Sequence, residues 1–286
     1  MQTVRSSEMV GRVNRKRRAK THVGPVARRA LTAAMEDIAR QAGADVIGFG
    51  DVRAALPADF NHLPVGMSLG VVHPAVRSLR LLPGGAPGNE LERALCDHRD
   101  RHAQELLETT LRRLADYLQV QGFRYFCCPP EVDPMDSPFT ALLVRRFSHK
   151  AAATCAGLGW VGRHGLLNHP EYGPHVTWAT LVTNAPLDTG TPTVESLCGE
   201  CSLCVSACPA GAISGRPWRR DDGMVSLVDT EKCRQMLADN ERATGRRFCG
   251  RCAVVCAGAR VAARSGVSAR IDERGGGARL SRESAL

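Results

Sequence analysis

The sequence lacks any apolar run approaching the roughly 20 residues that a membrane-spanning helix requires, so we expect no membrane partner. Its basic first residues are not followed by an apolar segment, because Arg28 and Arg29 interrupt the only candidate. A secretory signal is therefore not expected, and we expect a cytoplasmic protein. With 43% hydrophobic residues in 286, the chain is long enough for one large and one small folded domain.

Acidic residues are scarce at both ends of the chain, whose formal net charge is +9. Residues 1–30 hold nine Lys or Arg and one acid, and residues 260–286 hold six Arg and three acids. The segment between them is close to neutral. Two interpretations of the N-terminal charge stay open: a solvated tail, or a segment that contacts nucleic acid such as tRNA.

Cysteine, in contrast, is abundant, and eight of the 12 cysteines fall within residues 198–256. A disulfide scaffold needs an oxidising compartment and is usual in small secreted chains, and neither condition is expected here. In a reducing compartment, a dense cysteine cluster favours metal binding. The other four cysteines have no partner at metal-ligand spacing and are interpreted as small buried hydrophobic residues: Cys96, Cys127, Cys128 and Cys155.

Hydrophobic periodicity predicts a series of helices and strands before the cysteine-rich segment. The helices are expected over 25–43, 89–120 and 140–156, and the strands over 44–50, 65–72, 123–128 and 175–182. The apolar face of the second helix is expected to comprise Leu91, Leu95, His102, Leu106, Leu111, Leu114 and Leu118. The alternation of helix and strand favours an α/β class.

The fold class that we predict is therefore an α/β (α+β) N-terminal domain followed by a small two-cluster ferredoxin-like domain. The predicted organisation is a basic flexible tail over 1–21, an α/β cofactor or substrate domain over 22–190, a double 4Fe–4S domain over 191–262 and a disordered tail over 263–286.

The first cysteine motif is Cys198-x2-Cys201-x2-Cys204-x3-Cys208, followed by Pro209. This spacing is that of the bacterial ferredoxin run for a 4Fe–4S cluster, in which three thiolates wrap one cluster and the fourth ligates another. A zinc site more often shows two separated pairs of ligands around one tetrahedral ion. The motif predicts an iron–sulfur cluster.

A second motif, Cys249-x2-Cys252-x3-Cys256, follows the isolated Cys233. Two clusters need eight ligands, and eight cysteines lie in this segment. By the exchange of the fourth ligand, one cluster is predicted on Cys198, Cys201, Cys204 and Cys256, and the other on Cys208, Cys233, Cys249 and Cys252. Ala257, rather than proline, follows the last cysteine of the second motif.

A glycine-rich segment, Gly157-x-Gly159-x-x-Gly162, matches the dinucleotide fingerprint in spacing alone. That fingerprint requires a strand before it and a helix after it, whereas here a helix is predicted to precede it. We therefore do not interpret it as a dinucleotide site. The glycines still indicate a sharp turn or a close approach of a neighbouring segment.

The stretch 148–187, followed by the first cysteine motif, resembles the epoxyqueuosine reductases and their shorter relatives. The resemblance rests on Ala156-Gly157-Leu158-Gly159-Trp160, Gly162, Leu166-Leu167, Gly173 and Thr183, and on the order and spacing of both cysteine motifs. It runs from about residue 140 to 257 and continues weakly upstream through 43–52 and 63–72. The related corrinoid enzymes include the reductive dehalogenases.

The resemblance implies an α/β domain that holds a corrinoid (cobalamin) and a domain with two 4Fe–4S clusters that pass electrons to it. It also implies that the corrinoid lies next to Gly157, Gly159 and Gly162, and that an external donor of the ferredoxin or flavodoxin type supplies the electrons. Epoxyqueuosine reductases reduce a nucleoside bound to tRNA. The corrinoid signature Asp-x-His-x-x-Gly is absent, because Asp100-x-His102 continues to Glu105.

The sequence departs from the family pattern at an acidic motif and after the second cysteine motif. The family's Val-Asp-Thr-x-Pro motif has its nearest match at Val132-Asp133-Pro134, about ten residues too far upstream of the glycines. We do not expect the helical-repeat extension of the long family members, because few residues follow the second cysteine motif. The proton donor stays open among Asp133, Asp136, His149 and Tyr172. Turn formation and packing are the alternative roles of these residues.

The function that these observations predict is an iron–sulfur oxidoreductase that passes electrons through two clusters to a corrinoid or a substrate in the N-terminal domain. The alternative is a ferredoxin-type electron-transfer protein without a corrinoid, in which the N-terminal domain docks a partner.

Overall fold

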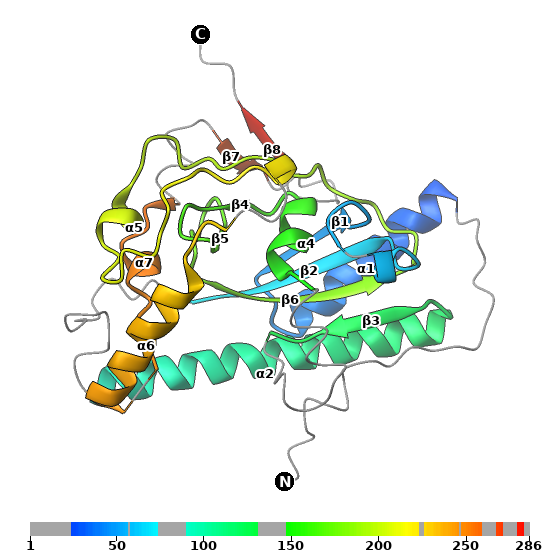
Figure 1. Ribbon diagram of the computed structural model, residues 1–286. Helices are drawn as coiled ribbons and strands as arrows, with labels where there is room; N and C mark the ends of the chain where they lie inside the picture. Colours follow the sequence, from blue (N-terminus) through cyan, green and yellow to red (C-terminus); the bar gives the residue numbers. More distant parts are fainter. Residues whose placement is uncertain are drawn as a thin grey trace.

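The computed structural model shows a four-stranded sheet with helices on both faces and a cysteine-rich segment beside it (Figure 1). The residues that it describes are 24–56, 58–73, 90–130, 147–222, 226–245, 247–258, 267–270 and 279–282. Within the described residues, no helix is long and apolar enough to cross a membrane.

The sheet contains four strands in the order β1-β2-β6-β3, and every neighbouring pair is antiparallel. These strands are β1 (Val46–Asp51), β2 (Val65–Val72), β3 (Tyr125–Cys128) and β6 (Val176–Thr183). All four lie where the apolar runs predict them. Because the pairing is antiparallel, the fold is the α+β form of the predicted class.

Two helices cover one face of this sheet, α1 (Pro25–Gln41) and α2 (Glu90–Gln121). Their apolar residues pack with alternate residues of β2, including Met67 and Leu69, in the largest core cluster. In α2, Leu111, Leu114 and Leu118 are fully buried as the periodicity predicts. His102 is exposed, however, and its neighbour Ala103 is in the core. The expected face is therefore wrong by one residue in this part of the helix.

The opposite face of the sheet carries the short helix α4 (His149–Cys155) and the two-stranded hairpin of β4 (Trp160–Val161) and β5 (Leu167–Asn168). Ser148 caps α4, since its side chain accepts a hydrogen bond from the backbone N–H of Ala151. The predicted helix over 140–156 therefore begins at His149 within the described residues, and residues 140–146 lie outside them. A short 3-10 turn, η2 (Ala58–Phe60), connects β1 and β2.

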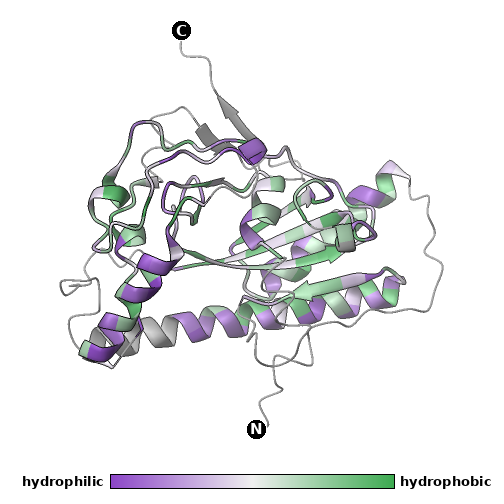
Figure 2. Ribbon diagram, viewed as in Figure 1, coloured by the Kyte–Doolittle hydropathy of each residue, from purple (hydrophilic) through white to green (hydrophobic). Residues whose placement is uncertain are grey.

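The cysteine-rich segment is built from short helices joined by irregular loops. They are α5 (Leu203–Ser206), η3 (Arg220–Asp222), α6 (Thr230–Thr244) and α7 (Arg251–Val254). Figure 2 shows that apolar residues follow the sheet, whereas α6 is largely hydrophilic. Beyond this segment, β7 (Val267–Arg270) and β8 (Arg279–Arg282) form an antiparallel pair inside the tail that we expect to be disordered.

Candidate metal centre

The structure brings four of the eight cysteines to one pocket, and we call these Cys198, Cys201, Cys204 and Cys256 the first group. The backbone N–H of Cys201 donates to the carbonyl of Cys198 (3.0 Å), and this tight turn directs both thiols to the same pocket. Cys204 lies in α5, which packs on α7, and Cys256 follows α7. The grouping is that of the exchanged ligand set.

The other four, Cys208, Cys233, Cys249 and Cys252, are the second group. Burial raises the pKa of Cys249, and the nearby thiols of Cys233 and Cys208 raise it further. Burial likewise raises the pKa of Cys252 to about 11, with Cys249, Cys204 and Cys208 adding to the shift. Cys249 is therefore within electrostatic reach of Cys208 and Cys233, and Cys252 is within reach of Cys208, Cys249 and Cys204.

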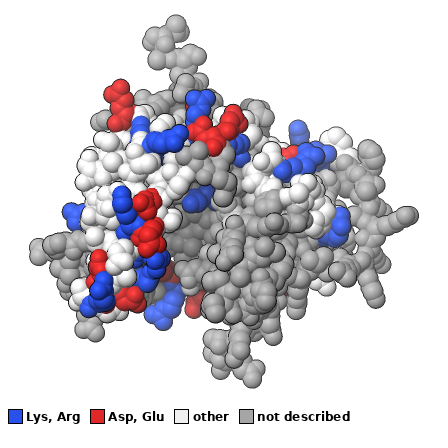
Figure 3. All heavy atoms as spheres, viewed as in Figure 1, with Lys and Arg blue, Asp and Glu red and all other residues white. Residues whose placement is uncertain are grey.

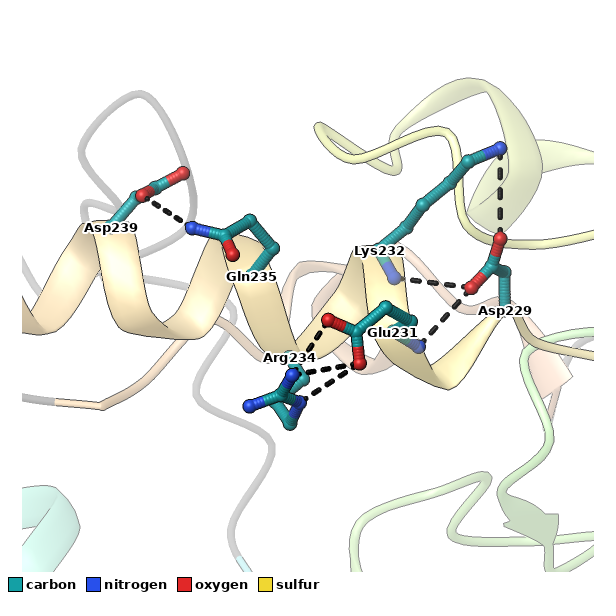
Figure 4. A network of polar contacts seen from close by, with 6 residues as sticks. All are labelled: Asp229, Glu231, Lys232, Arg234, Gln235 and Asp239. Carbon is teal, nitrogen blue, oxygen red and sulfur yellow. Dashed lines mark hydrogen bonds and ion pairs between the residues drawn. The ribbon is translucent and has the colours of Figure 1, made fainter.

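Cys233 is presented by α6, whose first turn is fixed by a polar network (Figure 4). Asp229 caps the helix by accepting hydrogen bonds from the backbone N–H groups of Glu231 and Lys232 (both 3.1 Å). Arg234 pairs with Glu231 at 2.6 Å. Figure 3 shows Lys and Arg side chains interspersed with Asp and Glu over this helix, so the charges of α6 are mixed in sign.

Burial also raises the pKa of Cys256 to about 12, and the other thiols of the first group add to the shift. Thiolates are the form of cysteine that binds metal, so grouping them requires compensating positive charge, and metal binding would release their protons. Among the described residues, no group of three or more His, Cys, Asp or Glu side chains is placed to hold a single metal ion.

The β4–β5 hairpin forms the remaining wall of the first-group pocket through Trp160, His164 and Asn168. The His164 Nε2 lies 3.2 Å from the Cys256 Sγ. The Asn168 Oδ1 lies 3.5 Å from the same sulfur. The Arg163 guanidinium donates to the carbonyl of Gly199 (2.6 Å), between two cysteines of the first motif. The hairpin therefore contacts the cysteine-rich segment directly.

Gly159 and Gly162 allow this hairpin to close. A Cβ on Gly159 would lie 2.0 Å from the carbonyl oxygen of Asn168. A Cβ on Gly162 would lie 2.6 Å from the Asn168 Nδ2 and 2.7 Å from the His164 Cε1. The space beside both glycines is thus filled by the protein itself. Helix α4 precedes the glycines, β4 lies between Gly159 and Gly162, and the next described element is the strand β5 and not a helix, as the argument against a dinucleotide site requires.

The structure describes two of the four candidate proton donors, Tyr172 and His149. Asp133 and Asp136 lie outside the described residues. Tyr172 stacks on His169, with ring centroids 4.8 Å apart, and burial together with the charge of Glu171 raises its pKa. This tyrosine therefore stays protonated at neutral pH and stands beside a turn closed by paired backbone hydrogen bonds between His169 and Gly173.

His149 is engaged at both ring nitrogens. Its Nδ1 lies 2.9 Å from the Thr180 Oγ1, and its Nε2 lies 3.1 Å from the carbonyl oxygen of Pro129. Because a carbonyl only accepts, Nε2 carries the proton and Nδ1 accepts from the threonine hydroxyl. Burial lowers the pKa of His149 to about 4. The ring is thus a neutral packing group that links α4 to β6.

This burial predicts a dependence of stability on pH. The unfolded chain takes up a proton on His149 near pH 6.5 and the folded chain near pH 4, so stability falls as pH falls through that window. His149→Gln retains hydrogen-bonding groups but does not titrate. When the pH falls from 7 to 5, we expect the free energy of unfolding to decrease by about 2 kcal/mol less in this variant than in the unmodified chain. Urea unfolding at the two pH values measures this difference. Equal losses in both proteins would contradict the assigned neutral state.

The remaining cysteines lie in the α+β core. Cys127, Cys128 and Cys155 are buried, as expected, and the Cys96 side chain is outside the described residues. The Cys155 Sγ accepts a hydrogen bond from Arg220 (3.3 Å), which also donates to the Thr154 hydroxyl (2.9 Å). Arg220 thus joins the cysteine-rich segment to α4 at a second point.

Three side chains at the first-group pocket have no chemical role in the sequence-based prediction: Trp160, His164 and Asn168. Trp160 belongs to the stretch that carries the family resemblance, but no spacing rule singles out the other two. Their contacts with Cys256 join residues 92 and 88 positions apart. A glycine on each side of Trp160 and Val161 is the one local signal that a neighbour approaches closely here.

Comparison with known proteins gives matches in sequence and in structure. A model of the 4Fe–4S binding domain matches residues 192–214, which contain the whole first motif. An epoxyqueuosine reductase of Listeria monocytogenes is 39% identical over 115 residues, covering 38% of this chain and 29% of its own length. Over this part of its length the chain is similar to epoxyqueuosine reductases. The family resemblance seen in the sequence is confirmed.

Two solved structures have a similar fold. A crystal structure of epoxyqueuosine reductase with an epoxyqueuosine-modified tRNA-Tyr stem loop aligns with a TM-score of 0.51 at 20% identity, over 81% of this chain and 66% of that chain. A catabolic reductive dehalogenase aligns with a TM-score of 0.55 at 18% identity, over 78% of this chain and 31% of that chain. The predicted fold class is confirmed. The chain spans less than two thirds of the length of these relatives.

Proposed function

We propose that this chain is an iron–sulfur reductase in which two 4Fe–4S clusters pass electrons to an acceptor held by the α+β domain. The first group of cysteines would hold one cluster and the second group the other. The observation that carries the proposal is the shared pocket: Trp160, His164 and Asn168 of the hairpin line it together with four thiols. A simple ferredoxin has no need of such a wall, whereas a reductase must bring a cluster close to the domain that binds its substrate.

The residues around the first group fit a cluster by the chemistry of their donors. Cysteine thiolates are the usual ligands of iron–sulfur clusters, and sulfur atoms accept hydrogen bonds from nearby N–H groups. The Trp160 Nε1 and Asn168 Nδ2 are buried N–H donors with no hydrogen-bond partner among the described residues. Both belong to residues that line the pocket. When bound, the clusters would supply one-electron transfer.

The protein's own residues prepare this site in three ways. Turns at Cys198 and in α5 direct the thiols, the hairpin covers one side against water, and Arg163 fixes the first cysteine loop through the Gly199 carbonyl. Cys252 of the second group lies within electrostatic reach of Cys204, so the second cluster would lie next to the first. Electrons from an external ferredoxin- or flavodoxin-type donor would enter through one cluster and leave through the other.

Two of the three glycines that the resemblance links to a corrinoid face other residues of the chain. The sides of Gly159 and Gly162 that lack a side chain face Asn168 and His164, so these two glycines do not cradle a cofactor there. Gly157 has a positive φ of 73°, which places it in the turn after α4. We therefore propose an acceptor in the α+β domain without assigning residues to it. A nucleoside of tRNA is the proposed substrate class, because a solved relative was crystallised with a modified tRNA stem loop.

Metal analysis of anaerobically purified protein, made with cobalamin supplied, tests this proposal. Two 4Fe–4S clusters predict about eight iron atoms per chain, and a corrinoid acceptor adds about one cobalt. Eight irons without cobalt would support the alternative of an electron-transfer protein or a direct transfer to substrate. Zinc in place of iron would overturn the proposal.

A further inference from the structure

The imidazole of His164 is aimed at a cysteine of the first group with a defined tautomer. Its Nδ1 accepts a hydrogen bond from the backbone N–H of Leu166 (3.1 Å). A nitrogen that accepts carries no proton, so in the neutral ring Nε2 is the protonated nitrogen. That Nε2–H lies 3.2 Å from the Cys256 Sγ, within the range of an N–H···S hydrogen bond. The hairpin turn therefore presents a donor to this sulfur.

The neutral state of the ring follows from its contacts. His164 is 5% exposed, and its Nδ1, which accepts from Leu166, carries no proton. Lys150 of α4 donates to the carbonyl of Gly165 (2.8 Å), which holds the turn beside the imidazole. The turn that carries the ring is therefore tied to α4.

Asn168 adds a second polar group at the same sulfur. Its Oδ1 lies 3.5 Å from the Cys256 Sγ and accepts from the thiol, while its buried Nδ2 has no partner among the described residues. A thiolate has no proton to give. Once Cys256 is deprotonated, rotation of the amide by half a turn would direct Nδ2–H to the sulfur instead, since the two ends of the amide have the same shape.

We propose that His164, supported by Asn168, is a positioning residue that donates a hydrogen bond to Cys256 and thereby raises the reduction potential of the first-group cluster. This inference rests on the proposed function, which places a cluster on Cys256. One-electron reduction adds negative charge to the cluster and its sulfur ligands, so an N–H donor stabilises the reduced state more than the oxidised state. The donor comes from the α+β domain, and the potential would therefore depend on correct docking of the cysteine-rich segment.

Two substitutions at one position separate the donor from the rest of the side chain. His164→Asn keeps an acceptor near the position of Nδ1, for the Leu166 N–H, but is too short to reach Cys256. His164→Gln places an amide N–H near the position of Nε2. We expect the first cluster of His164→Asn to have a lower reduction potential than in the unmodified protein. We expect the potential in His164→Gln to stay near the original value, and the second cluster to be unchanged in both variants.

A redox titration followed by electron paramagnetic resonance, with dithionite as the reductant, measures these potentials in the iron-loaded full chain. Iron content is determined on the same samples. A full iron complement with the first cluster of His164→Asn at the unmodified potential would overturn the role of His164 and leave the cluster assignment standing. Absence of iron from the unmodified protein would instead overturn the proposed function.

If His164→Asn does not retain its first cluster, its reduction potential cannot be measured. A measurement on the unmodified protein then tests the proposal. Protein labelled with ¹⁵N-histidine is reduced and studied by pulsed electron paramagnetic resonance. We expect a weak coupling of one histidine nitrogen to the reduced cluster, and its loss in labelled His164→Gln, where the donor is an unlabelled amide. A reduced cluster with no histidine nitrogen coupling would overturn the proposal.

Discussion

Replacing Cys204 with alanine is expected to reduce the iron content from about eight to about four atoms per chain, because each 4Fe–4S cluster holds four irons. Cys204 is 7% exposed, lies in α5 and lines the first-group pocket. Its loss removes one of four ligands, and the buried pocket offers no other cysteine outside the second group. Iron analysis and the spectrum of the reduced protein measure the change.

The same substitution is expected to destabilise the cysteine-rich segment. This segment contributes little to the apolar core, whose clusters are formed by residues of the α+β domain. Cluster binding would therefore supply much of its folding free energy, as metal binding does in other small metal-binding domains. Faster proteolysis at loops of the segment than in the unmodified protein would report the loss.

Cys127→Ala provides the matched control. This cysteine is 4% exposed in β3, so the substitution also removes a buried sulfur. It belongs to the core cluster formed with α2 and should lower stability without changing the iron content. Equal iron in Cys204→Ala and the unmodified protein, or equal loss in both variants, would contradict the ligand assignment.

The strands and long helices could be predicted because each has a strong local pattern. The apolar run of 65–72 predicts β2 with the bounds that the structure has, since a central strand buried on both faces is apolar throughout. The order of the strands has no such local signature. It depends on β6, which follows the hairpin yet pairs with both β2 and β3.

The error in α2 has a local cause. Residues 102 and 103 are adjacent, and the periodic pattern allows either to continue the buried face. Ala103 is small and fits where the helix approaches its neighbours, whereas the polar ring of His102 is left exposed. Periodicity identifies a helix well, but it does not distinguish an alanine on the buried face from a larger residue beside it.

The candidate site also has one part that the sequence predicts and another that only the structure shows. Cysteine spacing predicts the ligands, because thiols two or three residues apart are brought together by a single turn. The contact between His164 and Cys256 joins residues 92 positions apart and depends on how the hairpin docks. No spacing within the sequence encodes that distance, so the positioning residue could be identified only from the structure.

Gly159→Ala is expected to prevent normal closure of the hairpin and to destabilise the domain by about 3 kcal/mol or more. The added Cβ would lie 2.0 Å from the carbonyl oxygen of Asn168, and this neighbour is backbone, which cannot rotate away. Either β4 or β5 must therefore shift, which would move Asn168 and His164 away from the first group. Thermal unfolding followed by circular dichroism should show a midpoint lower by roughly 6–12 °C.

Gly24→Ala is the control for this change, because a Cβ on Gly24 has nothing within 4 Å and its φ of −64° suits any residue. We expect its first-cluster spectrum to match that of the unmodified protein, and its unfolding midpoint to fall much less than that of Gly159→Ala, because the only expected loss is a weaker N-cap of α1. In Gly159→Ala, the spectrum of the first cluster should change more than that of the second, because the pocket that the hairpin lines contains cysteines of the first group and none of the second. A lower midpoint with an unaltered first cluster would show that the hairpin and the cluster are not coupled. Coupling of the two is what a reductase needs from this hairpin, since it makes the electron-transfer site form only when the α+β domain is correctly folded beside it.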